Sequence, residues 1–132
     1  AFLIEMTNDE RIYRVIDANL NRLKEGLRVV EDIKRYVFDD AKLAYKIKSL
    51  RHKAKIPQKE FLKFRNSQND VLKTSTKSEQ ERSNLDEIIT ANFKRAQESA
   101  RVLEECFKLI NLERAELFKS IRYELYELEK EL

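Results

Sequence analysis

The chain has very few residues that break regular structure: one glycine, Gly26, and one proline, Pro57, among its 132 residues. Multi-stranded β folds need many tight turns built from such residues, so they are almost excluded here. Charged residues make up 39% of the chain, and Leu, Glu, Lys and Arg dominate, which is typical of long amphipathic helices. The 42% of hydrophobic residues is enough for a modest core and too high for a disordered chain. We therefore predict an all-α fold, a single helical domain over residues 1–132.

Capping residues and breakers divide the chain into about five predicted helices. Thr7, followed three residues later by Glu10, has the pattern of a capping box and predicts a helix over about 9–39. Asp39–Asp40, Pro57, Asn84 and the region of Asn111 delimit further predicted helices over about 41–55, 58–65, 84–110 and 112–132. Residues 66–84 are polar, and loops of that length in a small domain tend to be functional or disordered.

An internal repeat is the most informative feature of the chain. Residues 16–31 align with residues 89–104, and eight of these sixteen pairs are identical. A second similarity follows each long helix, because residues 48–52 resemble residues 119–123. We predict a helical bundle built from repeat A (about 9–56), a connection (about 57–83) and repeat B (about 84–132). The two repeats are expected to pack face to face, related by an approximate two-fold axis.

Polar side chains recur at equivalent positions beside the apolar stripe of each long helix. On the first helix these are Asn19 and Arg22, with Glu25 at the edge of the stripe; on the second they are Asn92, Arg95 and Glu98. Burying such groups is costly unless they are paired or hydrogen-bonded. One interpretation is an intramolecular network in which each Arg pairs with the Glu three residues later. The other is a polar pocket on the two-fold axis, with the arginines directed at an anionic ligand.

Further candidates lie outside the two long helices. Arg51 and Arg122 occupy equivalent positions of the second similarity, and they form either surface ion pairs or part of the same anion site. The connection offers Arg65, Asp70 and Arg82, which would contact a phosphate or a metal if the connection is not simply solvated. No metal site is predicted, because His52 is the sole histidine. Cys106 aligns with Ile33, so we expect a core residue, and a single cysteine fits a reducing compartment.

Several classes of function are disfavoured. The net charge is only +3 with both signs interspersed, whereas a nucleic-acid-binding protein of this size more often has a concentrated basic face. No apolar run approaches the roughly 20 residues that span a bilayer, and residues 1–6 are too short and lack the basic leader of a signal peptide. No glycine-rich phosphate loop is present. We expect a cytoplasmic protein without nucleic-acid or membrane partners.

The repeated motif resembles a known family. The pattern Asp-Ala-Asn-x-x-Arg-x-x-Glu-x-x-Arg-Val-x-Glu at residues 17–31 resembles the helical domain found N-terminal to thiamine-phosphate synthase in some bacteria. Residues 91–105, 50–52 and 122–126 are similar to further signatures of that domain, and the resemblance covers about residues 11–129. The family's connecting loop carries Arg-Asp and Asp-Val-Gly, where this chain has Arg65-Asn66 and Asp70-Val71-Leu72.

The resemblance implies a place in thiamine biosynthesis. A synthase barrel needs roughly 200 residues or more, so this chain would be either a separate helical partner or an excised N-terminal domain. The family is associated with phosphorylation of hydroxymethylpyrimidine phosphate, which implies a small anionic phosphate ligand and, for a kinase, ATP and Mg²⁺. The alternative is a non-catalytic module that forms a homodimer or docks onto a thiamine-phosphate synthase barrel. The sequence leaves open whether the chain is an enzyme.

Overall fold

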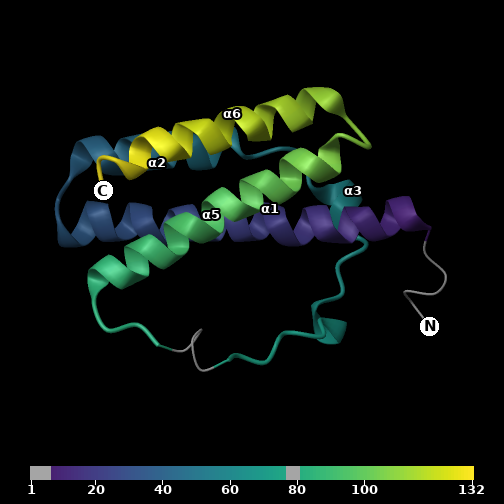
Figure 1. Ribbon diagram of the computed structural model, residues 1–132, viewed down its shortest axis with the longest axis horizontal. Helices are drawn as coiled ribbons and strands as arrows, with labels where there is room; N and C mark the ends of the chain where they lie inside the picture. Colours follow the sequence, from purple (N-terminus) through teal and green to yellow (C-terminus); the bar gives the residue numbers. More distant parts are fainter. Residues whose placement is uncertain (1–6, 77–80) are drawn as a thin grey trace.

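The computed structural model describes residues 7–76 and 81–132, and over these residues it contains helices and no strand (Figure 1). The predicted all-α bundle is therefore confirmed. The helices are α1 (Asn8–Asp32), α2 (Ala41–Lys53), α3 (Lys59–Leu62), α5 (Leu85–Phe107) and α6 (Leu112–Glu129), with a π-helical turn η1 (Ile33–Val37) and a 3₁₀ turn η2 (Ser67–Asn69). Residues 1–6, which we argued are no signal peptide, lie outside the described residues.

The predicted capping residues begin the long helices. The Thr7 hydroxyl accepts a hydrogen bond from the backbone N–H of Glu10, whose carboxylate in turn accepts from the Thr7 N–H, so the capping box is confirmed. The side chains of Asn84 and Asn111 likewise accept hydrogen bonds from backbone N–H groups in the first turns of α5 and α6. These caps satisfy donors that a helix leaves without an internal partner.

Several helices end earlier than predicted. α1 ends at Asp32 and continues as η1 to Val37, because the chain then turns through Asp39, whose φ of 49° lies in the left-handed region. α3 is only one turn long, and Phe61 is its one buried residue. α5 ends at Phe107, whose carbonyl accepts the N–H groups of Ile110 and Asn111 in a tight turn.

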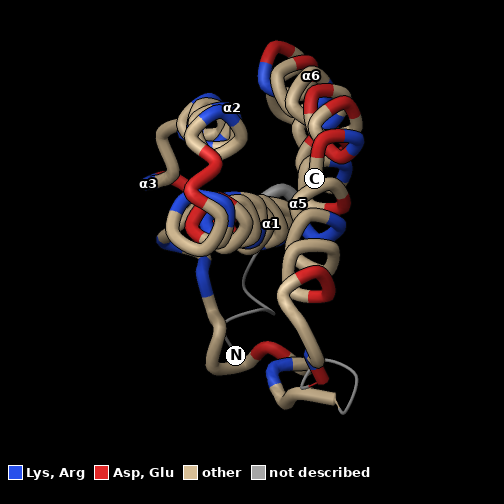
Figure 2. The backbone as a smooth tube through the Cα atoms, turned by 90° about the vertical axis from the view of Figure 1, so that its left-hand side faces the viewer, with Lys and Arg blue, Asp and Glu red and all other residues tan. Residues whose placement is uncertain are grey.

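α1 and α5 form the centre of the bundle, and they cross against each other (Figure 1). Viewed from the side, α2 lies over α1 and α6 lies over α5, on the same side of the crossing pair (Figure 2). The core includes the predicted stripe of α1, whose members are all at most 1% exposed: Ile16, Leu20, Leu23, Leu27 and Val30. At the crossing, a Cβ on Gly26 would lie 2.9 Å from the carbonyl oxygen of Asn92, which explains why a glycine is placed there.

The two halves of the sequence make matching contacts. The carboxylate of Glu31 at the end of α1 pairs with Arg51 of α2, and that of Glu104 in α5 pairs with Arg122 of α6, each at 2.8 Å. Asn19 and Asn92 each donate from Nδ2 to the backbone carbonyl four residues earlier, both at 2.9 Å. The two-fold relation between the repeats stays a prediction. No described helix has the length and apolar character needed to cross a membrane.

Candidate functional site

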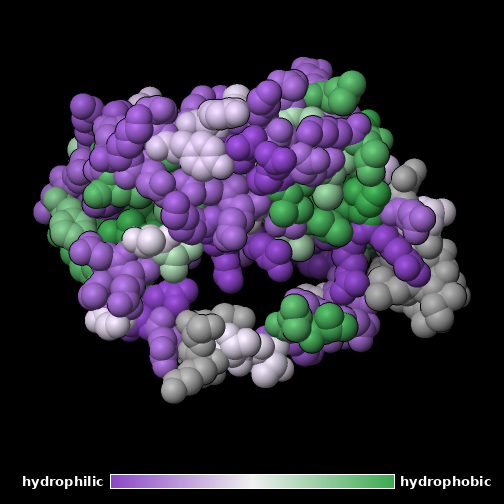
Figure 3. All heavy atoms as spheres, in the orientation of Figure 1, coloured by the Kyte–Doolittle hydropathy of each residue, from purple (hydrophilic) through white to green (hydrophobic). Residues whose placement is uncertain are grey.

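A cleft of about 580 Å³ lies between the first half of α1 and the connecting segment 65–71. Below the N-terminal half of α1 in Figure 1 the connection runs apart from the helices, and Figure 3 shows an open gap between it and the body. The charged side chains that line the cleft are those of Arg11, Arg14, Asp17, Arg22, Arg65 and Asp70, joined by the polar side chains of Asn19, Asn21, Asn66, Ser67 and Asn69. The lining is therefore rich in arginine.

Helical spacing explains why α1 presents these groups together. Arg11, Ala18 and Arg22 are separated by seven and four residues, so they fall on one face of the helix, and Arg14 lies close to that face. The apolar stripe of α1 faces α5, so this adjoining face is left to line the cleft.

A buried carboxylate ties the connecting segment to α1. Asp17 is 2% exposed, and its Oδ2 and Oδ1 accept hydrogen bonds from Arg65 Nε and Nη2 at 2.7 and 2.9 Å. Gln58 Nε2 also donates to Asp17 Oδ1, at 2.9 Å. Arg14 adds a second tie, because its Nη2 donates to the backbone carbonyl of Asn66 at 2.7 Å. Bidentate pairing of this kind fixes geometry as well as charge, so one wall of the cleft is held in place.

The cleft carries an excess of positive charge. Four arginines face two aspartates, and one of these, Asp17, is already bonded to Arg65 and Gln58. The hydrogen bond to Asp17 raises the pKa of the Arg65 guanidinium above its ordinary value. Arg22 is exposed, and within residues 7–76 and 81–132 no hydrogen-bond or ion-pair partner is found for it. A guanidinium held beside other guanidinium groups without a counter-charge favours an anion.

The structure brings some of the predicted site residues together. Asn19, Arg22, Arg65 and Asp70 all line this cleft. Asn19 is buried and its Nδ2 donates a hydrogen bond to the Val15 carbonyl. Asp70 is exposed at the rim, where its Oδ1 accepts from the backbone N–H of Leu72 at 3.0 Å.

The placement of Arg22 and Arg95 among the apolar residues of the long helices predicted that both would be buried, and this is wrong. Arg22, Glu25, Arg95 and Glu98 are all exposed, and the predicted pairing of each Arg with the Glu three residues later is not found among the described residues. These positions lie at the margin of the apolar arc, where a long side chain reaches water while its methylene groups cover the helix. The second set also does not converge with the first, because every described lining residue of the cleft comes from α1 or residues 65–71.

Arg51 and Arg122 contact carboxylates rather than the cleft. Their partners are Glu31 and Glu104, which are 1% and 5% exposed. The pKa of Arg122 is raised by its hydrogen bond to the Tyr126 hydroxyl and by Glu104. Arg82 lines a different hollow, at the start of α5 with Asn84 and Glu87.

Sequence reasoning did not select Asp17, Arg14 or Asn66. A search for repeated polar residues passes over Asp17 because Thr90 occupies the equivalent position. The charge of Asp17 could have indicated its role, because Asp17 adjoins the apolar stripe and a buried carboxylate needs a partner. Among the described residues no three His, Cys, Asp or Glu side chains form a group that could hold a metal ion. Cys106 is half-buried against the core, and burial raises the pKa of its thiol.

Curated relatives cover nearly all of this chain. It is 38% identical over 132 residues to the thiamine-phosphate synthase of Thermosynechococcus vestitus, which covers 98% of this chain and 38% of that protein. The thiamine-phosphate synthase of Prochlorococcus marinus is 41% identical, and the match covers 94% of this chain and 36% of that protein. The thiamine-phosphate synthase of Nostoc punctiforme is 38% identical, and the match covers 92% of this chain and 35% of that protein. The chain thus spans less than two-fifths of each of these relatives.

The family comparison matches most of the chain. No solved structure shows a significant match. The profile of the ThiD2 family matches residues 14–131, which include most of α1, most of the cleft residues and all the described helices after α1. With a match of that extent, the chain belongs to the ThiD2 family.

Proposed function

We propose that this chain serves thiamine biosynthesis by binding a pyrimidine phosphate in the cleft between α1 and residues 65–71. The observation that carries the proposal is the exposed guanidinium of Arg22, which has no partner among the described residues and lies among three further arginines of the cleft. Family membership and relatives named thiamine-phosphate synthase support the choice of pathway. We further propose that the reaction is phosphorylation of hydroxymethylpyrimidine phosphate.

Different residues of the cleft are suited to the phosphate group and to the pyrimidine ring of the proposed ligand. Arg22 offers its guanidinium group to phosphate oxygens, which such groups bind in a bidentate manner, and Arg11 adds positive charge to the same cleft. The amide oxygen of Asn19 can accept a hydrogen bond from the amino group of a pyrimidine. Arg65 and Arg14 position the wall of the cleft through their bonds to Asp17 and Asn66.

Phosphoryl transfer needs neutralisation of phosphate charge more than covalent chemistry from the protein. Mg²⁺ is commonly held by one or two carboxylates together with the phosphates of the substrates. Asp70 fits that need, because its carboxylate is exposed at the rim of an arginine-rich cleft. Asp17 does not, since both of its oxygens are bonded to Arg65. Glu25, Arg95 and Glu98 have no part in this proposal.

The first test is binding of hydroxymethylpyrimidine phosphate by isothermal titration calorimetry. Replacing Arg22 by Gln removes a charged hydrogen-bond donor, and such bonds contribute about 1.5–3 kcal/mol, so we expect affinity to fall roughly 10- to 100-fold. Arg95→Gln is the matched control, because Arg95 is the exposed repeat-equivalent arginine outside the cleft. Absence of binding by the unaltered chain, or equal losses in both variants, would contradict the proposal.

The kinase step has its own measurement. The unaltered chain with hydroxymethylpyrimidine phosphate, ATP and Mg²⁺ should form the pyrimidine diphosphate and ADP in equal amounts, as followed by ³¹P NMR. We expect Asp70→Asn to slow this reaction and Arg95→Gln to leave it unchanged. Binding without turnover would support instead a non-catalytic module for a thiamine-phosphate synthase barrel.

A further inference from the structure

The two outer helices carry opposite charges. α2 contains five lysines and arginines and no acidic residue, whereas α6 contains five glutamates and three basic residues, Arg114, Lys119 and Arg122, and is net acidic. The reversal occurs at repeat-equivalent exposed positions, because Lys42 corresponds to Glu113 and Lys53 to Glu124. A basic ridge on α2 and a mixed, net acidic ridge on α6 thus lie next to each other on one face of the molecule (Figure 2).

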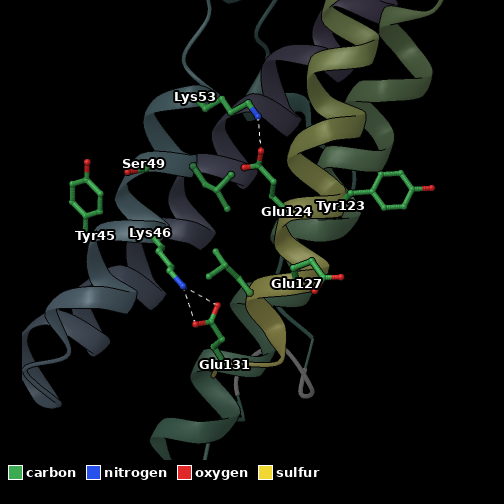
Figure 4. Close-up of a pocket in the computed structure, with 10 residues that line it drawn as sticks. Tyr45, Lys46, Ser49, Lys53, Tyr123, Glu124, Glu127 and Glu131 are labelled. Carbon is green, nitrogen blue, oxygen red and sulfur yellow. Dashed lines mark hydrogen bonds and ion pairs between the residues drawn. The ribbon is translucent and has the colours of Figure 1, made fainter.

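A groove of about 530 Å³ separates these two ridges. Leu50 and Leu128 lie at its floor, and two ion pairs cross it, Lys46 with Glu131 at 2.9 Å and Lys53 with Glu124 at 2.7 Å (Figure 4). The pairing order shows that α2 and α6 run antiparallel. Because these two ion pairs span the groove, it is poorly suited to a small ligand. The charged side chains of α2 and α6 then form one continuous face.

Large aromatic side chains are exposed on the same face. Tyr45 of α2 is 72% exposed and Tyr123 of α6 is 54% exposed, and both point outward from the groove in Figure 4. Tyr126, beside Tyr123, is 40% exposed. Tyrosines on a surface bordered by charges are typical of protein–protein interfaces.

We infer that this α2–α6 face binds a second copy of the same chain in a two-fold symmetric dimer, with the axis running along the groove. Rotation about that axis places the basic α2 of each copy over the acidic α6 of the other, and keeps the helices antiparallel. A complementary partner must carry an acidic ridge and a basic ridge side by side, at the same spacing as α2 and α6. A second copy of this chain meets that requirement. Symmetric interfaces of this kind are self-complementary.

The dimer would leave the α1 cleft accessible. The α2–α6 face lies on one side of the crossing pair α1 and α5, and the connecting segment lies on the opposite side (Figures 1 and 2). This inference therefore does not depend on the proposed ligand, and either idea can fail alone.

Charge reversal tests the interface. One variant carries Lys42→Glu, Lys46→Glu and Lys53→Glu; the other carries Glu124→Lys, Glu127→Lys and Glu131→Lys. The unaltered chain should sediment as a dimer at micromolar concentration. Each variant should be monomeric, with a dissociation constant weaker by at least ~100-fold, because like-charged ridges then face each other.

Mixing the two variants provides the decisive result. An equimolar mixture should form a heterodimer, seen as the mixed mass by native mass spectrometry, since each reversed ridge then meets its opposite. A chain carrying all six changes should form a homodimer, and it also restores the two ion pairs within the chain. Circular dichroism checks that each variant is helical. A monomeric unaltered chain, variants that stay dimeric, or a mixture of folded variants that stays monomeric would each overturn the inference.

Discussion

Two ion pairs each place a buried carboxylate against an arginine, and the pair of Glu104 with Arg122 is buried on both sides. Glu104 and Arg122 are 5% and 8% exposed, and the Arg122 guanidinium is also bonded to the Tyr126 hydroxyl. Such a pair gives little net stability over apolar residues of the same shape, but each member alone is costly to bury. The pair therefore specifies how α6 docks on α5 more than how strongly it docks.

A comparison of single and double variants tests that view. We expect Glu104→Leu to lower the free energy of unfolding by about 3–5 kcal/mol, because Arg122 stays buried without its counter-charge. The double variant Glu104→Leu with Arg122→Met should recover most of that loss. Urea unfolding followed by circular dichroism measures both. Arg101→Ala, which breaks the exposed pair with Glu105, is the control and should cost at most about 1 kcal/mol. A double variant no more stable than the single one would argue against this account.

At the scale of elements, the sequence predicted the long helices well and the short one poorly. Caps at Thr7, Asn84 and Asn111 are local signals, so the starts of α1, α5 and α6 follow from sequence alone. The length of α3 and the docking of the connection depend on contacts across 40 or more residues, such as Gln58 and Arg65 with Asp17. No local pattern encodes such contacts.

The same reason explains the incomplete prediction of the site. Arg22 and Asn19 stood out because the repeat duplicates them, and Arg65 and Asp70 because the connection is long and polar. Asp17, which joins these two regions, is repeated nowhere and is recognised only once its burial is known. The angle at which α1 and α5 cross decides that Arg95 is kept out of the cleft, and helix periodicity does not give that angle.

α3 buries one side chain against the bundle. Phe61 is fully buried, and its ring contacts those of Tyr13 in α1 and Phe107 in α5 edge-on, at centroid distances of 5.3 and 5.9 Å. We expect Phe61→Ala to cost about 3–5 kcal/mol, as measured by urea unfolding. Its exposed neighbour offers a control, since Leu62→Ala should change stability by no more than about 0.5 kcal/mol. Equal effects of the two substitutions would mean that α3 is not anchored in this way.

At the scale of the whole molecule, one apolar core extends through all the described α-helices. The cluster includes Leu23 of α1, Ile47 of α2, Phe61 of α3, Leu103 of α5 and Ile121 of α6. Because α1 and α5 share the most extensive contact in the fold, they should open only when the whole chain unfolds.

Hydrogen exchange followed by mass spectrometry measures that hierarchy. Amides in the central turns of α1 and α5, around Leu23 and Ala100, should exchange most slowly, at a rate set by global unfolding. Amides of residues 71–76 should exchange quickly, because all of these residues are exposed. Slowest exchange in α2 or α6 would place the stable centre of the fold elsewhere.

The clamp between Asp17 and Arg65 has no counterpart in the other half of the chain. Thr90 stands where a second carboxylate would be needed, and a threonine cannot hold a guanidinium by its two edges as a carboxylate does. The two similar halves of the sequence therefore differ at this position, and the carboxylate that anchors the connection is present in the first half alone. The clamped wall of the cleft is therefore found only beside α1 among the described residues, so the binding proposed above would involve one site per chain.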